Sequence, residues 1–301
     1  MNDVKCEHDA IHPRFRSKPD IYRSAVKVAL VQMHVCEKTA KNLETASREI
    51  VKAKDKGAQL VVLPECFNSP YGTKYFKEYA EEIPNGKSCT ALAKLANELS
   101  LCIIAGTIPE REGDKLYNTC TVWGNNGELL AKHRKVHLFD IDIPGQMTFK
   151  ESEVLSPGNK ITTFEYRGIK IGLGICYDLR FPEMAQIMSN DGCAILIYPG
   201  AFNLTTGPKH WELLARSRAN DNQLWMVLVS PARDKSASYV AWGHSMVVDP
   251  WGQVVEQLNE KPGILYADID LKAVDEVRTM IPIRNQKRND LYYIGNGNGC
   301  K

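Results

Sequence analysis

Several features that mark special classes of protein are missing from this 301-residue sequence. No apolar run approaches the length of a membrane span and no apolar segment of the secretory type opens the chain, which argues against a membrane anchor and against secretion. The net charge is only +2, and the basic cluster at residues 133–135 is too short for a binding stripe, so we expect no nucleic-acid partner. Linker-like segments and short-period repeats are also missing, so we expect one catalytic domain.

Paired cysteines are missing as well. The nine cysteines are odd in number, form no Cys-x-x-Cys pair, and in several cases lie in apolar strand patterns. This usage argues against a disulfide framework and a zinc site, and it fits a reducing compartment. The seven histidines are scattered; His133 and His137 lie in an extended-looking segment, where a spacing of four does not place them on one helical face. We therefore expect no metal and a cytoplasmic location.

The composition that remains is that of a globular protein with a sizeable core, because 44% of the residues are hydrophobic and 25% are charged. We divide the chain into a polar N-terminal extension (1–25), a catalytic domain (26–285) and a C-terminal tail (286–301). The tail is expected to form a surface arm or a subunit contact. Residues 1–25 interleave acidic with basic side chains, whereas a mitochondrial presequence should be poor in acids, so mitochondrial import is the weaker alternative.

From residue 26 onward, apolar strand patterns alternate in part with helical spacing and are joined in part by hairpin turns. The expected strands cover residues 26–33, 59–63, 101–107, 117–123, 128–134, 169–175, 193–198, 223–230, 239–248 and 253–256. The expected helices cover residues 39–56, 88–99, 182–190 and 208–220. Mixed sheets covered by helices are the architecture that such a pattern favours.

One cysteine stands where the local pattern favours chemistry. Cys176 follows the apolar strand at residues 169–175 and precedes a turn-and-helix signal in which Pro182 suits the first helical position. A thiol at such a junction projects from a rigid scaffold, and the backbone amide of Tyr177 can face a developing oxyanion. The alternative is a buried cysteine that acts only as a small hydrophobic residue.

A carboxylate and an ammonium stand at comparable positions. Glu65 follows the strand at residues 59–63, and Lys135 lies between an apolar strand and an apolar patch. Open sheets gather reactive groups from distant parts of a sequence at their strand ends. With the Cys176 thiol, these groups form a working set for acyl transfer, in which a carboxylate moves the thiol proton and an ammonium stabilises the oxyanion. Taken singly, each also has an ordinary alternative: a solvated glutamate, a surface lysine and a core cysteine.

The strings Leu-Pro-Glu at 63–65, Arg-Lys-Val-His-Leu-Phe at 134–139 and Gly-Ile-Cys-Tyr-Asp at 174–178 resemble the three signatures of the nitrilase (carbon–nitrogen hydrolase) superfamily. The resemblance covers the chain from about Val26 to Tyr293. It implies that Glu65 is the general base, Lys135 the oxyanion stabiliser and Cys176 the nucleophile. It also implies an α/β fold of four layers (αββα), in which helices cover two mixed sheets, with no cofactor and with assembly into a homodimer. Glu151 matches a second acidic position beside the lysine, and an exposed structural carboxylate is its alternative.

Further strings resemble the omega-amidase branch of this superfamily, among them residues 64–73, 137–142, 198–208 and 241–245. That resemblance implies a small anionic amide substrate. Omega-amidases hydrolyse the side-chain amide of 2-oxoglutaramate and 2-oxosuccinamate to a dicarboxylic keto acid and ammonia.

Three other hypotheses are kept. One is a related amidase, such as an enzyme for deaminated glutathione or a carbamoyl-amide hydrolase, which would differ in pocket shape. Another is a catalytically silent scaffold. The presence of all three residues, Glu65, Lys135 and Cys176, argues against it. A thiol-redox sensor is the weakest, because the odd cysteines show no evident resolving partner.

The residues that would bind an anionic substrate are less defined. The run at 205–208, beginning with Thr205, opens a helix whose free amides would attract a carboxylate, and Arg180 would add a cation. The alternatives are an ordinary helix cap at Thr206 and an ion pair of Arg180 with Glu183 or Asp178. Tyr71 and Phe202 are equally suited to line the pocket or to fill the core.

Overall fold

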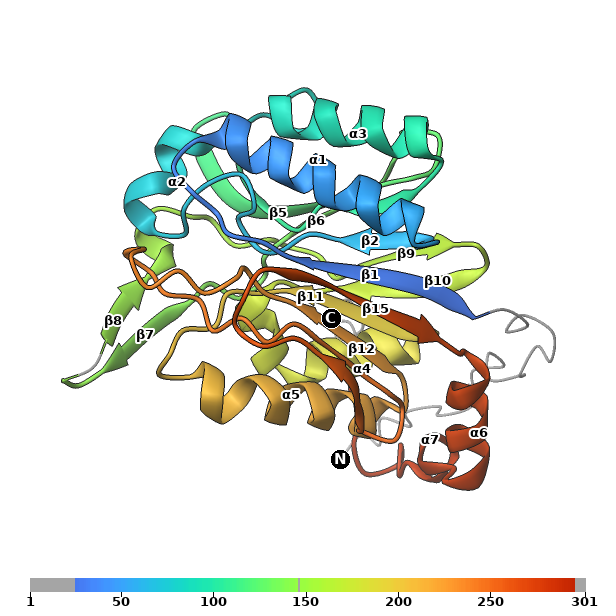
Figure 1. Cartoon of the computed structure of the whole chain (residues 1–301). Coiled ribbons are helices and arrows are strands. Elements are labelled where there is room, and N and C mark those ends of the chain that lie inside the picture. The colour runs from blue at the N-terminus through green and yellow to red at the C-terminus, as the bar shows by residue number, and fades with distance from the viewer. Residues whose placement is uncertain (1–24, 146, 296–301) are drawn as a thin grey trace.

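Two mixed β-sheets lie face to face in the computed structural model, which describes residues 25–145 and 147–295 (Figure 1). Helices α1 and α3 cover the outer face of the first sheet, and helices α4 and α5 cover the outer face of the second. The predicted four-layer αββα arrangement is therefore confirmed.

The first sheet combines parallel pairing in its centre with antiparallel pairing at both sides. Strands β1, β2 and β3 are parallel, and β15, β5, β4 and β6 pair antiparallel with their neighbours. In spatial order the strands are β15 (Gly263–Ile269), β1 (Val26–Gln32), β2 (Leu60–Val62), β3 (Cys102–Ile104), β5 (Lys115–Trp123) and β4 (Ile108–Glu112), and β6 (Leu129–Arg134) also pairs with β5.

The second sheet repeats this plan around the parallel strands β10, β11 and β12. Its order is β14 (Val254–Gln257), β13 (Met246–Val248), β12 (Trp225–Val229), β11 (Ile195–Pro199), β10 (Ile169–Leu173) and β9 (Thr162–Tyr166). A separate hairpin, β7 (Asp140–Ile143) and β8 (Met147–Lys150), projects from one end of the molecule.

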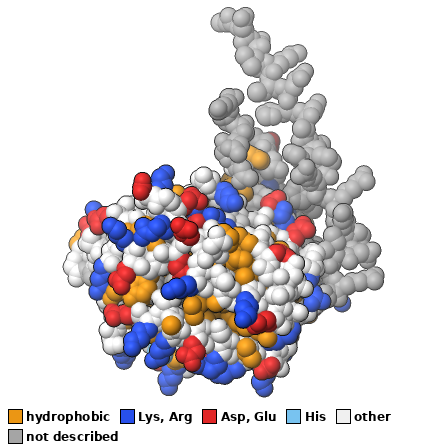
Figure 2. Space-filling view, turned by 90° about the horizontal axis from the view of Figure 1, so that it is seen from above, with side chains coloured by type: hydrophobic (Ala, Val, Ile, Leu, Met, Phe, Trp, Pro, Cys, Tyr) orange, Lys and Arg blue, Asp and Glu red, His pale blue; other side chains and the backbone are white. Residues whose placement is uncertain are grey.

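The helices that cover the sheets have the expected positions. The helical segments are α1 (Thr39–Asp55), α2 (Thr73–Tyr79), α3 (Lys87–Leu99), α4 (Pro182–Asn190), α5 (Gly207–Asn222), α6 (Lys272–Met280), α7 (Ile283–Gln286) and the 3-10 turns η1 (Glu151–Glu153) and η2 (Cys176–Arg180). The exposed sides of α1 and α3 carry cations among anions, as Figure 2 shows, and ion pairs such as Lys52–Glu49 and Lys94–Glu98 lie there.

Strand alternation explains how one short strand serves two cores. In β1, Val28 and Leu30 belong to the apolar cluster that includes residues of the second sheet, whereas Ala29 and Val31 belong to the cluster beneath α1 and α3. Successive side chains of a strand point to opposite faces, so a strand that is covered on both sides reads as a continuous apolar run. This is the pattern seen at residues 26–33 and in the other central strands.

Some elements differ from their prediction. The sequence did not indicate α2, β4, the β7–β8 hairpin, β9, β15, α6 or α7. The strand expected at 239–248 is only three residues long, and the chain before it forms a loop. Gly243 and His244 both have positive φ, at 76° and 59°, so the backbone there cannot continue as a strand.

Two glycines permit the backbone approaches on which the site depends. Gly106 has φ 52°, and a Cβ at this position would lie 2.0 Å from the carbonyl oxygen of Pro64, beside Glu65. A Cβ at Gly200 would lie 3.1 Å from the Cα of Cys176. These glycines therefore let the chain pass close to Glu65 and Cys176, the predicted base and nucleophile.

The described residues include only part of the two predicted terminal segments. The predicted N-terminal extension lies, except for residue 25, outside the described residues, and so do residues 296–301 of the predicted tail. Within the described part of the tail, Leu291, Tyr292 and Tyr293 are exposed. None of the helices in residues 25–145 and 147–295 is long and apolar enough to cross a membrane.

Candidate active site

The site forms where strands of both sheets end. Glu65 follows β2 of the first sheet, Cys176 follows β10 of the second, and Ala201 follows the adjacent strand β11. These are parallel strands, so their carboxyl ends can gather residues that are far apart in the sequence. Lys135 enters from the end of β6, and Glu151 lies at the start of η1, directly after the β7–β8 hairpin.

The Glu65 carboxylate is fully buried and is held on both oxygens. Oε1 accepts a hydrogen bond of 2.8 Å from the side-chain amide of Asn118, and Oε2 accepts one of 2.7 Å from the backbone amide of Ala201. The Nζ of Lys135 lies 3.4 Å from Oε1. Donors on two different sheets thus fix the orientation of one carboxylate.

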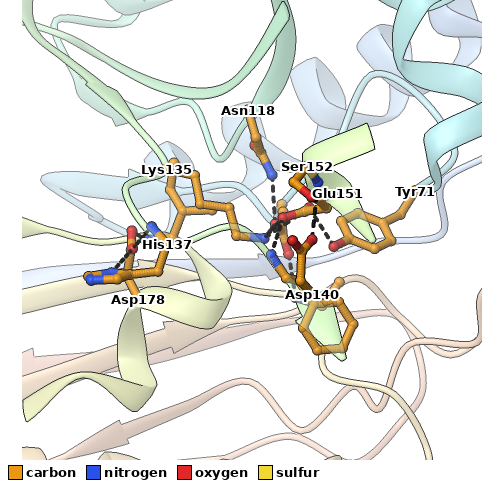
Figure 3. Close-up of polar contacts among 12 residues, drawn as sticks. Tyr71, Asn118, Lys135, His137, Asp140, Glu151, Ser152 and Asp178 are labelled. Atoms are coloured by element: carbon orange, nitrogen blue, oxygen red, sulfur yellow. Dashed lines mark hydrogen bonds and ion pairs between the residues drawn. The ribbon is translucent and has the colours of Figure 1, made fainter. Parts of the chain in front are cut away.

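The Lys135 ammonium lies between two carboxylates, at the centre of Figure 3. Its Nζ is 2.8 Å from Oε2 of Glu151, in addition to the contact with Glu65, and the three side chains are inaccessible to solvent. Glu151 also accepts hydrogen bonds of 2.7 Å from the Tyr71 hydroxyl and from the backbone amide of Phe139. Glu151 is therefore a buried partner of the lysine and not an exposed carboxylate.

Cys176 has the geometry of a constrained nucleophile. Its φ is 47°, a left-handed conformation that is unfavourable for a residue with a side chain and is often found at functional positions. The side chain is buried, and both the Glu65 carboxylate and the Lys135 ammonium lie near enough to shift the pKa of its thiol. The structure thus brings the predicted base, lysine and cysteine together.

Burial and the mutual charges of Glu65, Glu151 and Lys135 determine the pKa values in this cluster. Burial raises the pKa of Glu65, and the Lys135 ammonium opposes this effect while the Glu151 carboxylate adds to it. Burial and the Glu65 carboxylate raise the pKa of the Cys176 thiol well above its usual value, and Lys135 acts in the opposite direction. Burial disfavours the charged form of Lys135, but the carboxylates of Glu151 and Glu65 outweigh it and raise the pKa of this lysine. The lysine is thus kept as an ammonium, and Glu65 gains affinity for a proton.

A cavity of about 610 Å³ leads to this cluster from the surface. It is lined by Glu65, Cys66, Tyr71, Ala201 and Tyr239, and further by residues 35–38, 41, 231, 232, 234 and 236–238. The Tyr71 ring stacks on Phe149, and the Tyr239 hydroxyl donates a hydrogen bond of 2.6 Å to the carbonyl of Ala201. Tyr71 therefore lines the cavity and also packs in an aromatic cluster.

Arg180 is placed next to the nucleophile without a carboxylate partner among the described residues. Its guanidinium carbon lies 4.8 Å from the centre of the Phe202 ring, and its Nη1 is 3.2 Å from Nδ1 of His210. The ion pairs with Glu183 or Asp178 that sequence reasoning kept as alternatives are not formed. Burial lowers the pKa of Arg180, and Cys176 and Tyr177 are the first of the groups that oppose this.

The other proposed substrate-binding residues have mixed surroundings. Phe202 packs on Trp211 in the core, and the Tyr177 ring packs against Phe139. The backbone amides of Thr205 and Thr206 both donate to the side-chain oxygen of Asn203, at 3.0 and 2.9 Å. Asn203 thus orders the loop before α5, the N-cap residue Thr206 makes no side-chain capping bond, and these two amides are already occupied.

Sequence reasoning missed residues that orient the cluster. Asn118, Tyr239 and the backbone amide of Ala201 were not predicted, and Asp178 was considered only as a partner of Arg180. A buried asparagine inside the apolar strand at 117–123 is a signal that would have identified Asn118, since buried polar side chains need partners. The hydrogen bond from Ala201 is a backbone contact, so no pattern of side chains in the sequence predicts it. Within residues 25–145 and 147–295, His, Cys, Asp and Glu form no group that could hold a metal ion.

Comparisons with known proteins agree with this geometry. The sequence profile of the carbon–nitrogen hydrolase family matches residues 27–279. The chain is 57% identical to the Omega-amidase NIT2 of Bos taurus over 268 residues, which cover 89% of this chain and 97% of the relative. It is 55% identical to the Omega-amidase NIT2 of Homo sapiens over 271 residues, covering 90% of this chain and 98% of the relative.

A solved structure shares the fold. Saccharomyces cerevisiae Nit3, described as a member of branch 10 of the nitrilase superfamily, has a TM-score of 0.82 and 44% sequence identity with this chain. The match covers 89% of this chain and 98% of the yeast protein.

Two of the tyrosines that line the cavity, Tyr71 and Tyr239, allow a test of the charge on Glu151. We predict that Tyr71→Phe lowers the free energy of unfolding by about 1.5–3 kcal/mol, because it removes a hydrogen bond to a buried charged group. The matched variant Tyr239→Phe removes a hydrogen bond to a neutral carbonyl and should cost only about 0.5–1.5 kcal/mol. Urea unfolding of both variants measures the difference, and a smaller cost for Tyr71→Phe would show that Glu151 is not an ionised partner of the lysine.

Proposed function

Since the chain belongs to the carbon–nitrogen hydrolase family, we propose that it is an omega-amidase, which hydrolyses the terminal amide of small 2-oxo-dicarboxylic acid monoamides such as 2-oxoglutaramate and 2-oxosuccinamate. The observation that carries the proposal is the convergence of Glu65, Lys135 and Cys176 in one buried cluster. The identity of 55–57% with omega-amidases over most of the chain supports the choice of substrate class.

In the first half of the proposed reaction, Glu65 takes the proton of the Cys176 thiol as the sulfur attacks the amide carbon. The carbonyl oxygen becomes an oxyanion, to which the Lys135 ammonium and the backbone amide of Tyr177 are assigned as stabilising groups. The raised pKa of Glu65 suits this proton transfer, since a general base works best when its pKa lies near the operating pH. Glu65 then gives the proton to the leaving nitrogen, the carbon–nitrogen bond breaks, and ammonia leaves a thioester on Cys176.

In the second half, a water molecule takes the place of ammonia. Glu65 accepts a proton from this water as its oxygen attacks the thioester carbon, and the same two donors hold the second oxyanion. Breaking the carbon–sulfur bond releases the carboxylic acid, and the proton on Glu65 returns to the thiolate. Glu151 takes no proton in this scheme, because its ion pair with Lys135 serves to keep the ammonium in place.

Arg180 is the residue that we assign to the carboxylate of the substrate. Arg180 is a partly buried cation without a carboxylate partner in residues 25–145 and 147–295. Such a cation is unfavourable on its own, so an incoming carboxylate gains more there than at an exposed lysine. A guanidinium remains charged under these conditions and offers a bidentate donor pair. The guanidinium carbon lies 5.6 Å from the centre of the Tyr177 ring and 4.8 Å from that of the Phe202 ring, so both rings make cation–π contacts with it.

Assembly into a homodimer and a cytoplasmic location stay predictions that follow from the family resemblance and from the cysteine usage.

The proposed activity is tested with 2-oxoglutaramate and an ammonia assay. We expect the purified wild-type protein to release ammonia, and we expect Cys176→Ala to reduce the rate at least about 10⁴-fold, because the nucleophile cannot be replaced by water. Circular dichroism and size-exclusion chromatography should show the same folded assembly for both. Absence of ammonia from the wild-type protein at millimolar substrate would contradict the assignment and favour a related amidase.

The role of Arg180 is tested by comparing two amides. Arg180→Gln should lower kcat/KM for 2-oxoglutaramate by about 10–100-fold, the loss expected for one charged hydrogen-bond partner. For an uncharged aliphatic amide of the same length, the ratio of variant to wild type should stay near one. Arg48→Gln, which removes an exposed arginine on α1 paired with Glu49, is the control. An equal loss for both amides would assign Arg180 to the support of the nucleophile and not to the carboxylate.

A further inference from the structure

The proposed reaction assigns no role to a further buried carboxylate near the cluster, that of Asp178. Asp178 lies two residues after the nucleophile, is fully buried, and lies on the opposite side of Lys135 from Glu151 (Figure 3). Its pKa is well below the usual range because, although burial opposes ionisation, hydrogen bonds from His133 and His137 favour the charged form. Asp178 is therefore a fixed anion that does not exchange protons at neutral pH.

The contacts of Asp178 join two segments that come from different sheets. Oδ2 accepts a hydrogen bond of 3.0 Å from the backbone amide of Ile175, the residue before the nucleophile. Oδ1 accepts one of 2.8 Å from the backbone amide of His137, two residues after the catalytic lysine. The same oxygen is 2.8 Å from Nδ1 of His137, and the His133 ring approaches Oδ2 at 3.4 Å.

The backbone segments at Cys176 and at Lys135 both depend on hydrogen bonds from outside the sheets. Cys176 has a left-handed backbone that must be held against its preference, and the bond to Ile175 fixes the peptide that precedes it. The chain at Lys135 has left the β6 pairing, and its backbone is tied to the carbonyl of Asn118 and to the amide of Gly158. Asp178 connects this segment to the nucleophile segment through the backbone amide of His137, at 2.8 Å from Oδ1, and through the longer contact of the Val136 amide, at 3.5 Å from Oδ2.

We propose that Asp178 is a positioning residue for the reaction: its two carboxylate oxygens clamp the backbone on either side of the cluster, one beside Cys176 and one beside Lys135, and so set the distance between the thiol and the ammonium. The residue touches no substrate and acts through the two segments that it binds. The turnover readout of this inference rests on the proposed function, whereas the thiol readout described below does not.

Asp178→Asn is a sharp test because it cannot preserve both arms of the clamp. Each oxygen of Asp178 faces a backbone N–H, and an asparagine replaces one of them by an NH₂ group, which cannot accept a hydrogen bond. Either the bond from Ile175 or the bond from His137 is therefore lost, while side-chain size is kept. The contact of the Val136 amide with Oδ2, at 3.5 Å, is too long to replace the bond from His137. A misplacement of reacting groups by about 1 Å can cost about 100-fold in rate.

We expect Asp178→Asn to lower kcat for 2-oxoglutaramate by about 100-fold while KM changes by less than about threefold. Alkylation of Cys176 by iodoacetamide, followed by peptide mass spectrometry at one mildly alkaline pH, should be about tenfold slower, because the ammonium no longer favours the thiolate at its fixed distance. Both measurements are made at a temperature at which circular dichroism shows the variant fully folded. If the wild-type protein hydrolyses no omega-amide, the proposed function fails, and the alkylation comparison still tests Asp178.

Glu110→Gln is the matched control. Glu110 is also a buried carboxylate with several donors, but these are the side chains of Arg134, Lys132 and Thr119. Arg134 precedes Lys135, so this variant disturbs the same strand without touching the clamp. It should lose stability and keep kcat within about threefold of wild type.

Three results would overturn the inference. The first is a folded Asp178→Asn protein with wild-type kcat and alkylation rate, and the second is a loss in Glu110→Gln as large as that in Asp178→Asn. If Asp178→Asn does not fold, Asp178→Glu replaces it, since this variant keeps the charge but shifts the oxygens by one methylene. It should lower kcat at least about tenfold, and full activity in this folded variant is the third contradicting result.

Discussion

The buried ion pair of Lys135 with Glu65 and Glu151 is the interaction on which the site depends. Two ionised carboxylates in a solvent-free position repel each other unless a cation lies between them, and removing one partner of a buried pair typically costs about 3–5 kcal/mol. Each carboxylate in turn has neutral donors of its own, from Asn118 and Ala201 on one side and from Tyr71 and Phe139 on the other. The position of one ammonium is thereby linked to the end of β11, to the aromatic wall of the cavity and to the base of the β7–β8 hairpin.

The packing of the two sheets is what brings the members of this cluster together. Glu65 and Cys176 come from parallel strands of different sheets, so the base and the nucleophile meet only if the sheets are packed face to face. The apolar cluster between the sheets supplies that packing, and Gly106 and Gly200 let the backbone approach closely behind Glu65 and Cys176. The packing that stabilises the core therefore also sets the geometry of the cluster. A shift of one sheet against the other would separate the groups.

The central elements, and the candidate residues Glu65, Lys135 and Cys176 that the structure brings together, could be predicted from the sequence because their signals are local. Apolar runs identify strands such as 26–33, and the position of Cys176 between a strand and a proline-initiated turn is visible in a few residues. The contacts that orient the cluster are different, since the hydrogen bond from Ala201 to Glu65 joins residues 136 positions apart and that from His137 to Asp178 joins residues 41 apart. Such contacts depend on the packing of the sheets. The start of α5 shows the same limit, because the predicted cap Thr206 makes no side-chain capping bond, and its own backbone amide donates to the side chain of Asn203.

The central claim is that the Cys176 sulfur receives the acyl group while Glu65 and Lys135 act on the same carbonyl. The most direct measurement is rapid acid quenching of the enzyme during turnover of 2-oxoglutaramate, followed by intact-mass and peptide mass spectrometry. The account predicts an adduct whose mass is that of the substrate less ammonia, located on Cys176 and removed by hydroxylamine as a thioester. Release of ammonia without any adduct on Cys176, or with the acyl group on another cysteine, would contradict it.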